Sequence, residues 1–72
     1  MNIGMLWLDD DKSRSLEEKV ERAADYYREK YGHKPNLCYV NNQAIEGELN
    51  VDKVVVLPAG HIRPQHLWIG IG

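Results

Sequence analysis

Apolar residues fall into four short runs along the chain, separated by polar segments. The first run, IGMLWL at residues 3–8, stops at three consecutive aspartates. A run this short that ends at a polar cluster favours a β-strand over a helix. Runs at residues 37–40, 51–57 and 66–71 are similarly rich in aliphatic and aromatic side chains. We therefore expect four strands.

The segment between the first two runs has the periodicity of a helix. Apolar residues recur every three or four positions from Leu16 to Tyr31, and charged residues occupy the other faces. Ser15 and Glu18 have the spacing of a capping box, in which each side chain accepts a backbone N–H of the other residue. Gly32 can adopt the left-handed conformation that ends a helix. The pattern predicts a helix over residues 16–31.

The order of these elements predicts an α+β fold. A strand, a helix and a returning strand in one sheet form a right-handed crossover, so the first two strands should be parallel. The connection at residues 58–65 is short enough to join antiparallel neighbours, and residues 42–50 are expected to form a loop. The prediction is one domain over residues 1–72 with the order β-α-β-β-β, in which a mixed four-stranded sheet has the helix packed on one face.

The predicted strands are apolar on both faces, although one helix can cover only one of them. Half-exposed strands normally alternate apolar and polar residues, but residues 5–8 and 54–57 do not. If Leu6 and Leu8 face the helix, Trp7 faces away, and Trp68 is expected to join it. Two solutions stay open: the loops at 41–50 and 58–65 fold over the second face, or a protein partner covers it.

We expect this second face to bind a partner, because aromatic residues and arginine are enriched at protein interfaces. The expected contacts are the apolar side chains of Trp7, Tyr39, Val55 and Trp68, with a polar rim of His61 and Arg63. The partner is expected to be a second copy or another protein. A chain of 72 residues can form only a small hydrophobic core, and two-fold dimers are the commonest oligomers. The chain is thus interpreted as an interaction or homodimerising module without a cofactor, rather than an enzyme.

Three aspartates end the first strand, at the place where open sheets bind ligands. The segment LWLDDD resembles the first strand and acidic pair of response-regulator receivers, and DKVVVLPAG at residues 52–60 is similar to their third strand. Leu57 stands where a receiver has its phosphoacceptor aspartate. The segment LWLDDDKS is also similar to the first motif of haloacid-dehalogenase phosphatases, which carry further motifs on a much larger domain. We interpret the aspartates as a solvated strand end before a helix N-terminus, where negative charge is favourable.

An alternative site combines these aspartates with the loop at residues 59–66, AGHIRPQH. Carboxylates and imidazoles are ligands for divalent metals, and the loop also offers an amide and a guanidinium to a small ligand. The residues of this alternative site are Asp9, Asp11, His61 and His66. Zinc ligands could also come from His33, Cys38, His61 and His66, but the spacing of these four residues is not that of a known zinc finger. The alternative site at the aspartates and the loop predicts an activity that depends on a small ligand or a divalent metal.

Composition narrows the class of protein. Nine basic residues against eleven acidic ones give a net charge of -2, which argues against a nucleic-acid partner. The single cysteine, Cys38, lies in an apolar run and is expected to be a buried, inert thiol. No apolar run approaches the length of a membrane span, and the first residues lack the basic start of a signal peptide. We expect a cytoplasmic protein of prokaryotic style that does not contact membranes.

Overall fold

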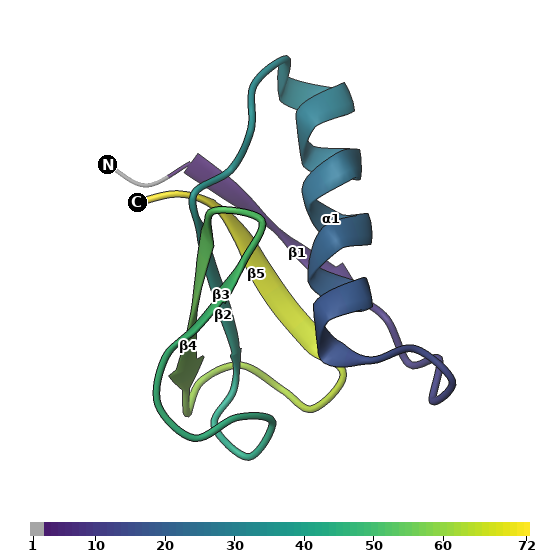
Figure 1. The fold of residues 1–72 in the computed structure, drawn as a ribbon, viewed down its shortest axis with the longest axis vertical. Helices are drawn as coiled ribbons and strands as arrows, with labels where there is room; N and C mark the ends of the chain where they lie inside the picture. The colour runs from purple at the N-terminus through teal and green to yellow at the C-terminus, as the bar shows by residue number, and fades with distance from the viewer. Residues whose placement is uncertain (1–2) are drawn as a thin grey trace.

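The computed structural model describes residues 3–72, which form one helix packed on a five-stranded sheet (Figure 1). The elements are β1 (Ile3–Leu8), α1 (Leu16–Tyr31), β2 (Leu37–Asn41), β3 (Leu49–Val51), β4 (Val54–Ala59) and β5 (His66–Ile71). The strand order across the sheet is β1-β5-β2-β4-β3. The α+β class and the single helix are confirmed, but the sheet has five strands where four were predicted.

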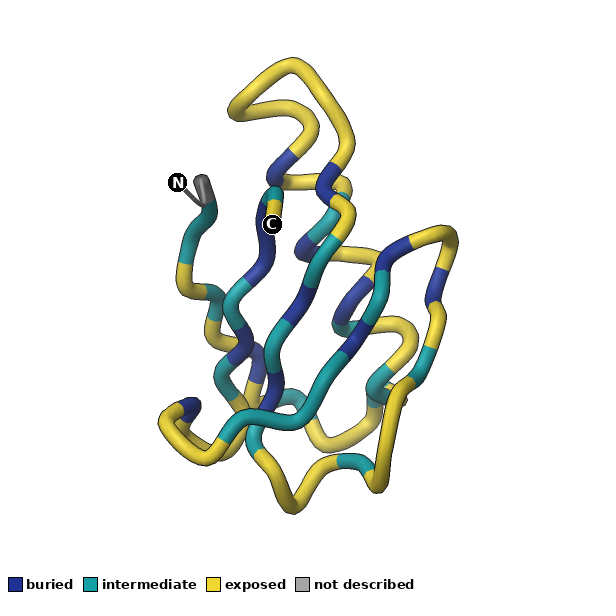
Figure 2. Tube along the Cα trace, turned by 90° about the vertical axis from the view of Figure 1, so that its left-hand side faces the viewer, coloured by how far each residue is buried: buried dark blue, intermediate teal, exposed yellow. Residues whose placement is uncertain are grey.

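The sheet is mixed, and its last strand lies inside it. β5 pairs antiparallel with both β1 and β2, so β1 and β2 run in the same direction without being neighbours. β4 pairs parallel with β2 and antiparallel with β3. The expectation that residues 58–65 join neighbouring strands is wrong, because β2 lies between β4 and β5. The chain instead crosses the end of β2 to reach β5 (Figure 2).

The fifth strand arises from a tight hairpin inside the third predicted run. Asp52 and Lys53 have φ angles of 48° and 67°, and they connect the paired residues Val51 and Val54. Two consecutive positive φ angles give a two-residue turn whose twist matches that of the flanking strands. The single strand predicted over residues 51–57 is therefore wrong: its first residue belongs to β3, the next two form the turn, and the others belong to β4.

The helix α1 begins and ends at the predicted residues. The Glu18 N–H donates to Ser15 Oγ at 3.2 Å, and the Glu18 carboxylate accepts the Ser15 N–H at 3.4 Å. Gly32 has a φ angle of 80°, and its N–H donates to the carbonyl of Arg28. One side of the helix is fully buried through Val20, Ala23 and Tyr27. This stripe holds the helix on one face of the sheet.

The core lies between α1 and the sheet. Its sheet side is formed by the buried side chains of Cys38, Val40, Val56, Leu67 and Ile69. Burial raises the pKa of the Cys38 thiol to about 12, so the group stays protonated at neutral pH. The predicted buried, free thiol is confirmed. Among residues 3–72, no helix is long and apolar enough to cross a membrane.

The side chains of β1 point to the opposite faces of the sheet from those predicted. The indole of Trp7 packs against the core on the helix side, and its ring centre lies 4.9 Å from that of Tyr26. Leu6 and Leu8 point to the other face and are 63% and 57% exposed. The expectation that Leu6 and Leu8 face the helix while Trp7 faces away is therefore wrong. Residues 5–8 contain no polar side chain that would have fixed the direction.

Candidate functional site: the helix-free sheet face

The sheet face opposite α1 carries a row of apolar side chains across four strands. The strand registers place Leu6 opposite Trp68, Trp68 opposite Tyr39, and Tyr39 opposite Leu57. We call these four residues the apolar row. The rings of Tyr39 and Trp68 are 5.8 Å apart. All four side chains keep contact with solvent. The residues before and after Tyr39 and Trp68 point to the helix side and are buried, and Figure 2 shows this alternation along the central strands.

The apolar row continues into a second, smaller row. Leu37 lies opposite Val55, and both are half-buried on the same face. Gly4 and Gly70 pair at this level, so neither contributes a side chain. A Cβ atom built at Gly4 would overlap the indole ring of Trp68. Glycine at position 4 therefore leaves the space into which the indole extends.

One end of this face is covered by the loop between β4 and β5. The Asn41 side chain donates to the carbonyl of Ile62 at 2.8 Å, which ties the loop to the end of β2. Ile62 is only 6% exposed but is not part of the core beneath α1. The ring of His61 lies 6.3 Å from that of Tyr39. The loop, which crosses this end of the sheet in Figure 2, thus shelters the end of the face, whereas the side chains of the apolar row keep contact with solvent.

The other loop does not contribute to this cover. Ile45, in the segment between β2 and β3, packs against the core on the helix side. Of the two loops that could have covered the second face, only the one before β5 does so, and it does so in part. The apolar surface anticipated from the strand pattern is therefore real.

A shallow hollow lies where the β4–β5 loop meets β1. It is lined by Leu6, His61, Ile62, Arg63 and His66. His61 and Arg63 are exposed, and Nδ1 of His66 lies 3.0 Å from the carbonyl oxygen of Pro64. The hollow gives the apolar row a polar rim with one permanent positive charge. Five of the six residues expected at the interface lie on this face, and Trp7 does not.

The aspartates at the end of β1 are occupied by local contacts. Asp9 is only 6% exposed, and its two oxygens lie 3.1 and 3.3 Å from Nη1 of Arg14. Asp11 accepts hydrogen bonds from the hydroxyl and the N–H of Ser13, and these bonds lower the pKa of the Asp11 carboxyl. Both carboxylates therefore close the turn that leads into α1. The expectation that a nearby arginine partly neutralises the aspartates agrees with these contacts, because Nη1 of Arg14 also lies 3.3 Å from Asp11.

The alternative metal site is not assembled in the part of the chain that the structure describes. No three histidine, cysteine, aspartate or glutamate side chains gather there in a way that could hold a metal ion. His33 lies beyond the end of α1, with Nδ1 at 3.1 Å from the carbonyl oxygen of Tyr31, and Cys38 is in the core. Asp9 and Asp11 are used in the turn before α1, and the histidines lie on the rim of the open face.

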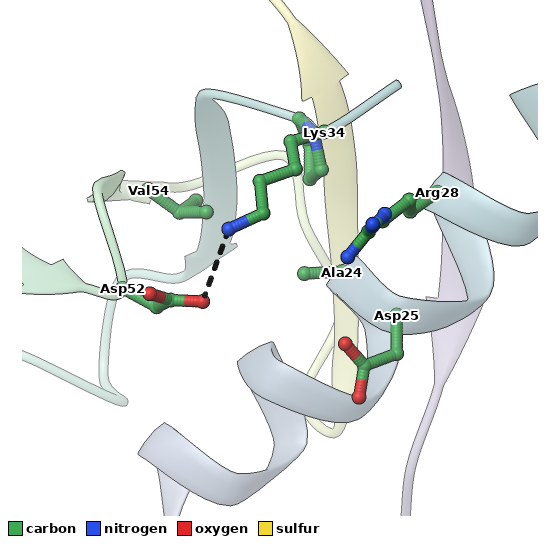
Figure 3. Close-up of a pocket in the computed structure, with 7 residues that line it drawn as sticks. Ala24, Asp25, Arg28, Lys34, Asp52 and Val54 are labelled. Carbon is green, nitrogen blue, oxygen red and sulfur yellow. Dashed lines mark ion pairs between the residues drawn. The ribbon is translucent and has the colours of Figure 1, made fainter. Parts of the chain in front are cut away.

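A small cleft between α1 and the β3–β4 turn was also not foreseen. It is lined by Ala24, Asp25, Arg28, Lys34, Pro35, Asp52 and Val54. Lys34 reaches towards Asp52, with Nζ 3.9 Å from the carboxylate, and both side chains are largely exposed (Figure 3). A cleft volume of about 20 Å³ is room for a single water molecule. This cleft is too small for a ligand-binding site.

Comparisons of the chain with protein-family models, curated proteins and solved structures gave no match.

Proposed function

We propose that this protein is a non-enzymatic interaction module that docks against a protein surface through the helix-free face of its sheet. The observation that supports this is the apolar row, which runs across four strands and stays in contact with solvent. Contiguous apolar patches rimmed by polar groups mark interaction sites on soluble proteins. Here Arg63 and His61 border the patch at one end.

The composition of the face suits a protein partner. Interface centres are enriched in tyrosine and tryptophan and depleted of charge, and arginine is common in interfaces. The centre of this face consists of Tyr39 and Trp68, whose neighbours Leu6 and Leu57 carry no charge. The partner is a second copy of the chain or a different protein with an apolar patch of its own. We place the binding of this partner in the cytoplasm, because the single cysteine is a free thiol and the cytoplasm keeps thiols reduced.

The energetics favour the two aromatic residues as the main contacts. Fully burying one large apolar side chain stabilises a complex by roughly 1.5–3 kcal/mol, and less where the side chain is already half-buried. Association costs roughly 4–15 kcal/mol in lost freedom of motion. Several residues of the face must therefore be buried together. Aromatic residues at the centre of an interface commonly contribute most of the binding energy.

Photo-crosslinking from the face tests the proposal. Tyr39 is replaced by a photoreactive phenylalanine analogue, and Tyr31, a partly exposed residue on the last turn of α1, serves as the matched control. Irradiation of cells that naturally make the protein should give a discrete protein adduct from position 39 and none from position 31. Leu57→Lys, which adds a charge to the apolar row, should remove that adduct.

A monomer without adducts would contradict the proposal. If the purified chain has the mass of one copy at tens of micromolar, and position 39 gives no adduct in cells, the face does not bind a protein. Equal adducts from positions 31 and 39 would show unspecific contact and would also contradict it.

A further inference from the structure

Strand β1 lies at an edge of the sheet, and one side of its backbone has no neighbouring strand among the described residues. The N–H of Asp9 donates to the carbonyl of Gln65 at 2.9 Å, on the side of β5. Because backbone groups alternate along an antiparallel strand, the N–H groups of Trp7 and Met5 also point towards β5. Those of Gly4, Leu6 and Leu8 consequently point outwards, together with their carbonyls.

This edge lacks the features that normally prevent strand edges from pairing. Natural proteins protect an edge with charged side chains, proline, a bulge, a very short strand or a covering loop. The sequence of β1 contains no charge and no proline, and β1 pairs with β5 in unbroken register from Ile3 to Leu8. The opposite edge differs, because β3 has three residues and is followed directly by the charged residues of the Asp52–Lys53 turn.

The exposed apolar side chains are concentrated on the same strand. Leu6 and Leu8 are the two most exposed of the large hydrophobic residues described. Both alternate with residues packed on the core side. An apolar edge strand with free backbone groups is a ready template for another strand.

We propose that two copies of the chain pair through β1, antiparallel and about a two-fold axis at Leu6, so that their sheets become continuous. This interface uses the backbone edge of β1 and goes beyond the docking face proposed above. In this register Leu6 lies opposite Leu6 of the second copy, and Gly4 lies opposite its Leu8. All the outward N–H and C=O groups of these three residues then find partners.

Side chains and charges favour this register over one with the two-fold axis at Leu8. The Leu8 side chain of the second copy would lie beside Gly4, where it packs against the indole of Trp68 that extends over Gly4. A two-fold axis at Leu8 would instead bring the aspartates that follow β1 next to their counterparts, and like charges repel. With the axis at Leu6, Asp9 to Asp11 lie outside the paired segment at both ends. The β1 edges of the two copies are thus complementary in their backbone groups, their apolar side chains and the placement of their charges.

Leu6→Pro tests the edge directly. Proline at this position removes an outward N–H but none of the hydrogen bonds to β5, and edge strands tolerate it for this reason. The wild-type chain should have the mass of two copies at tens of micromolar by light scattering, and the variant the mass of one. Leu57→Lys is the matched control, because it alters the apolar row on β4, away from β1, and should leave the dimer intact.

Amide hydrogen exchange of the wild-type chain is a second test, and it does not depend on whether Leu6→Pro folds. The amides of Leu6 and Leu8 should exchange roughly tenfold more slowly in the concentrated sample than after dilution. The amides of Met5 and Trp7, which point to β5, should be protected in both the concentrated and the diluted sample. A monomer at all concentrations would overturn this inference, as would a dimer with unprotected Leu6 and Leu8 amides. A dimer that Leu57→Lys dissociates would overturn it while supporting the docking face.

Discussion

At the scale of single residues, the turn before α1 depends on one nearly buried carboxylate. Asp9 contacts Arg14 through both oxygens and accepts the N–H of Asp11. Removing one partner of such a contact leaves the other charge without compensation in a poorly hydrated place. Asp9, Asp11 and Arg14 therefore have a structural role, which accounts for two of the three aspartates that follow the strand.

Asp9→Asn should destabilise the fold by about 1–3 kcal/mol, because the amide cannot replace the charged pair with Arg14. Urea unfolding followed by tryptophan fluorescence measures this change. Asp10→Asn provides the control, since Asp10 is exposed, and its effect should stay within about 0.5 kcal/mol. Equal effects of the two substitutions would show that the Asp9–Arg14 contact does not matter for stability.

Cys38 should be inert towards alkylating reagents in the folded protein. The thiolate is the reactive form, and burial raises the pKa of this thiol to about 12, so thiolate forms only as the pH approaches that value. Iodoacetamide at pH 8 should label the chain in denaturant and leave the native chain unlabelled by mass spectrometry. Rapid labelling of the native chain would mean that the core around Cys38, between β2 and α1, opens readily.

At the scale of elements, local signals predicted the helix and failed for the hairpin. The capping box of Ser15 and Glu18 and the glycine at position 32 act within a few residues of α1, so the sequence alone contains them. The β3–β4 turn has no glycine, although both of its residues have positive φ angles. The conformation of Asp52 and Lys53 follows from the antiparallel pairing of Val51 with Val54, in a hairpin whose strand β4 is held in the sheet by β2. A pattern of β-branched residues cannot show that kind of break.

Lys53→Gly should therefore stabilise the protein by about 1 kcal/mol. The left-handed conformation costs a lysine roughly 1–2 kcal/mol, and glycine adopts it without that cost. The reverse sign is expected for Glu21→Gly, at an exposed position inside α1, where glycine costs about 1 kcal/mol. Chemical denaturation of both variants checks the pair. Destabilisation by Lys53→Gly would contradict the strain assigned to the turn.

At the scale of the whole molecule, the sequence predicted an uncovered apolar face but not its residues on β1. The excess of apolar strand residues over what one helix can cover follows from composition, and Tyr39, Val55 and Trp68 lie on the open face as predicted. The side chosen for Trp7 was wrong, because an uninterrupted apolar run fits either direction. The position of β5 between β1 and β2 depends on pairing between the two ends of the chain, which no local pattern encodes.

The stability of the whole molecule should depend on its concentration. The thin core leaves an apolar face and an unprotected edge, and a partner that binds only the folded chain stabilises it by mass action. If the two copies pair through β1, each tenfold rise in concentration should add about 1.4 kcal/mol to the free energy of unfolding the dimer. Thermal melts from about 1 to 100 µM, concentrations that correspond to binding free energies of roughly -8 to -5.5 kcal/mol, should show a rising melting temperature for the wild type. Leu6→Pro should melt at one temperature throughout, and a constant melting temperature for the wild type would mean that the exposed strand stays unpaired in solution.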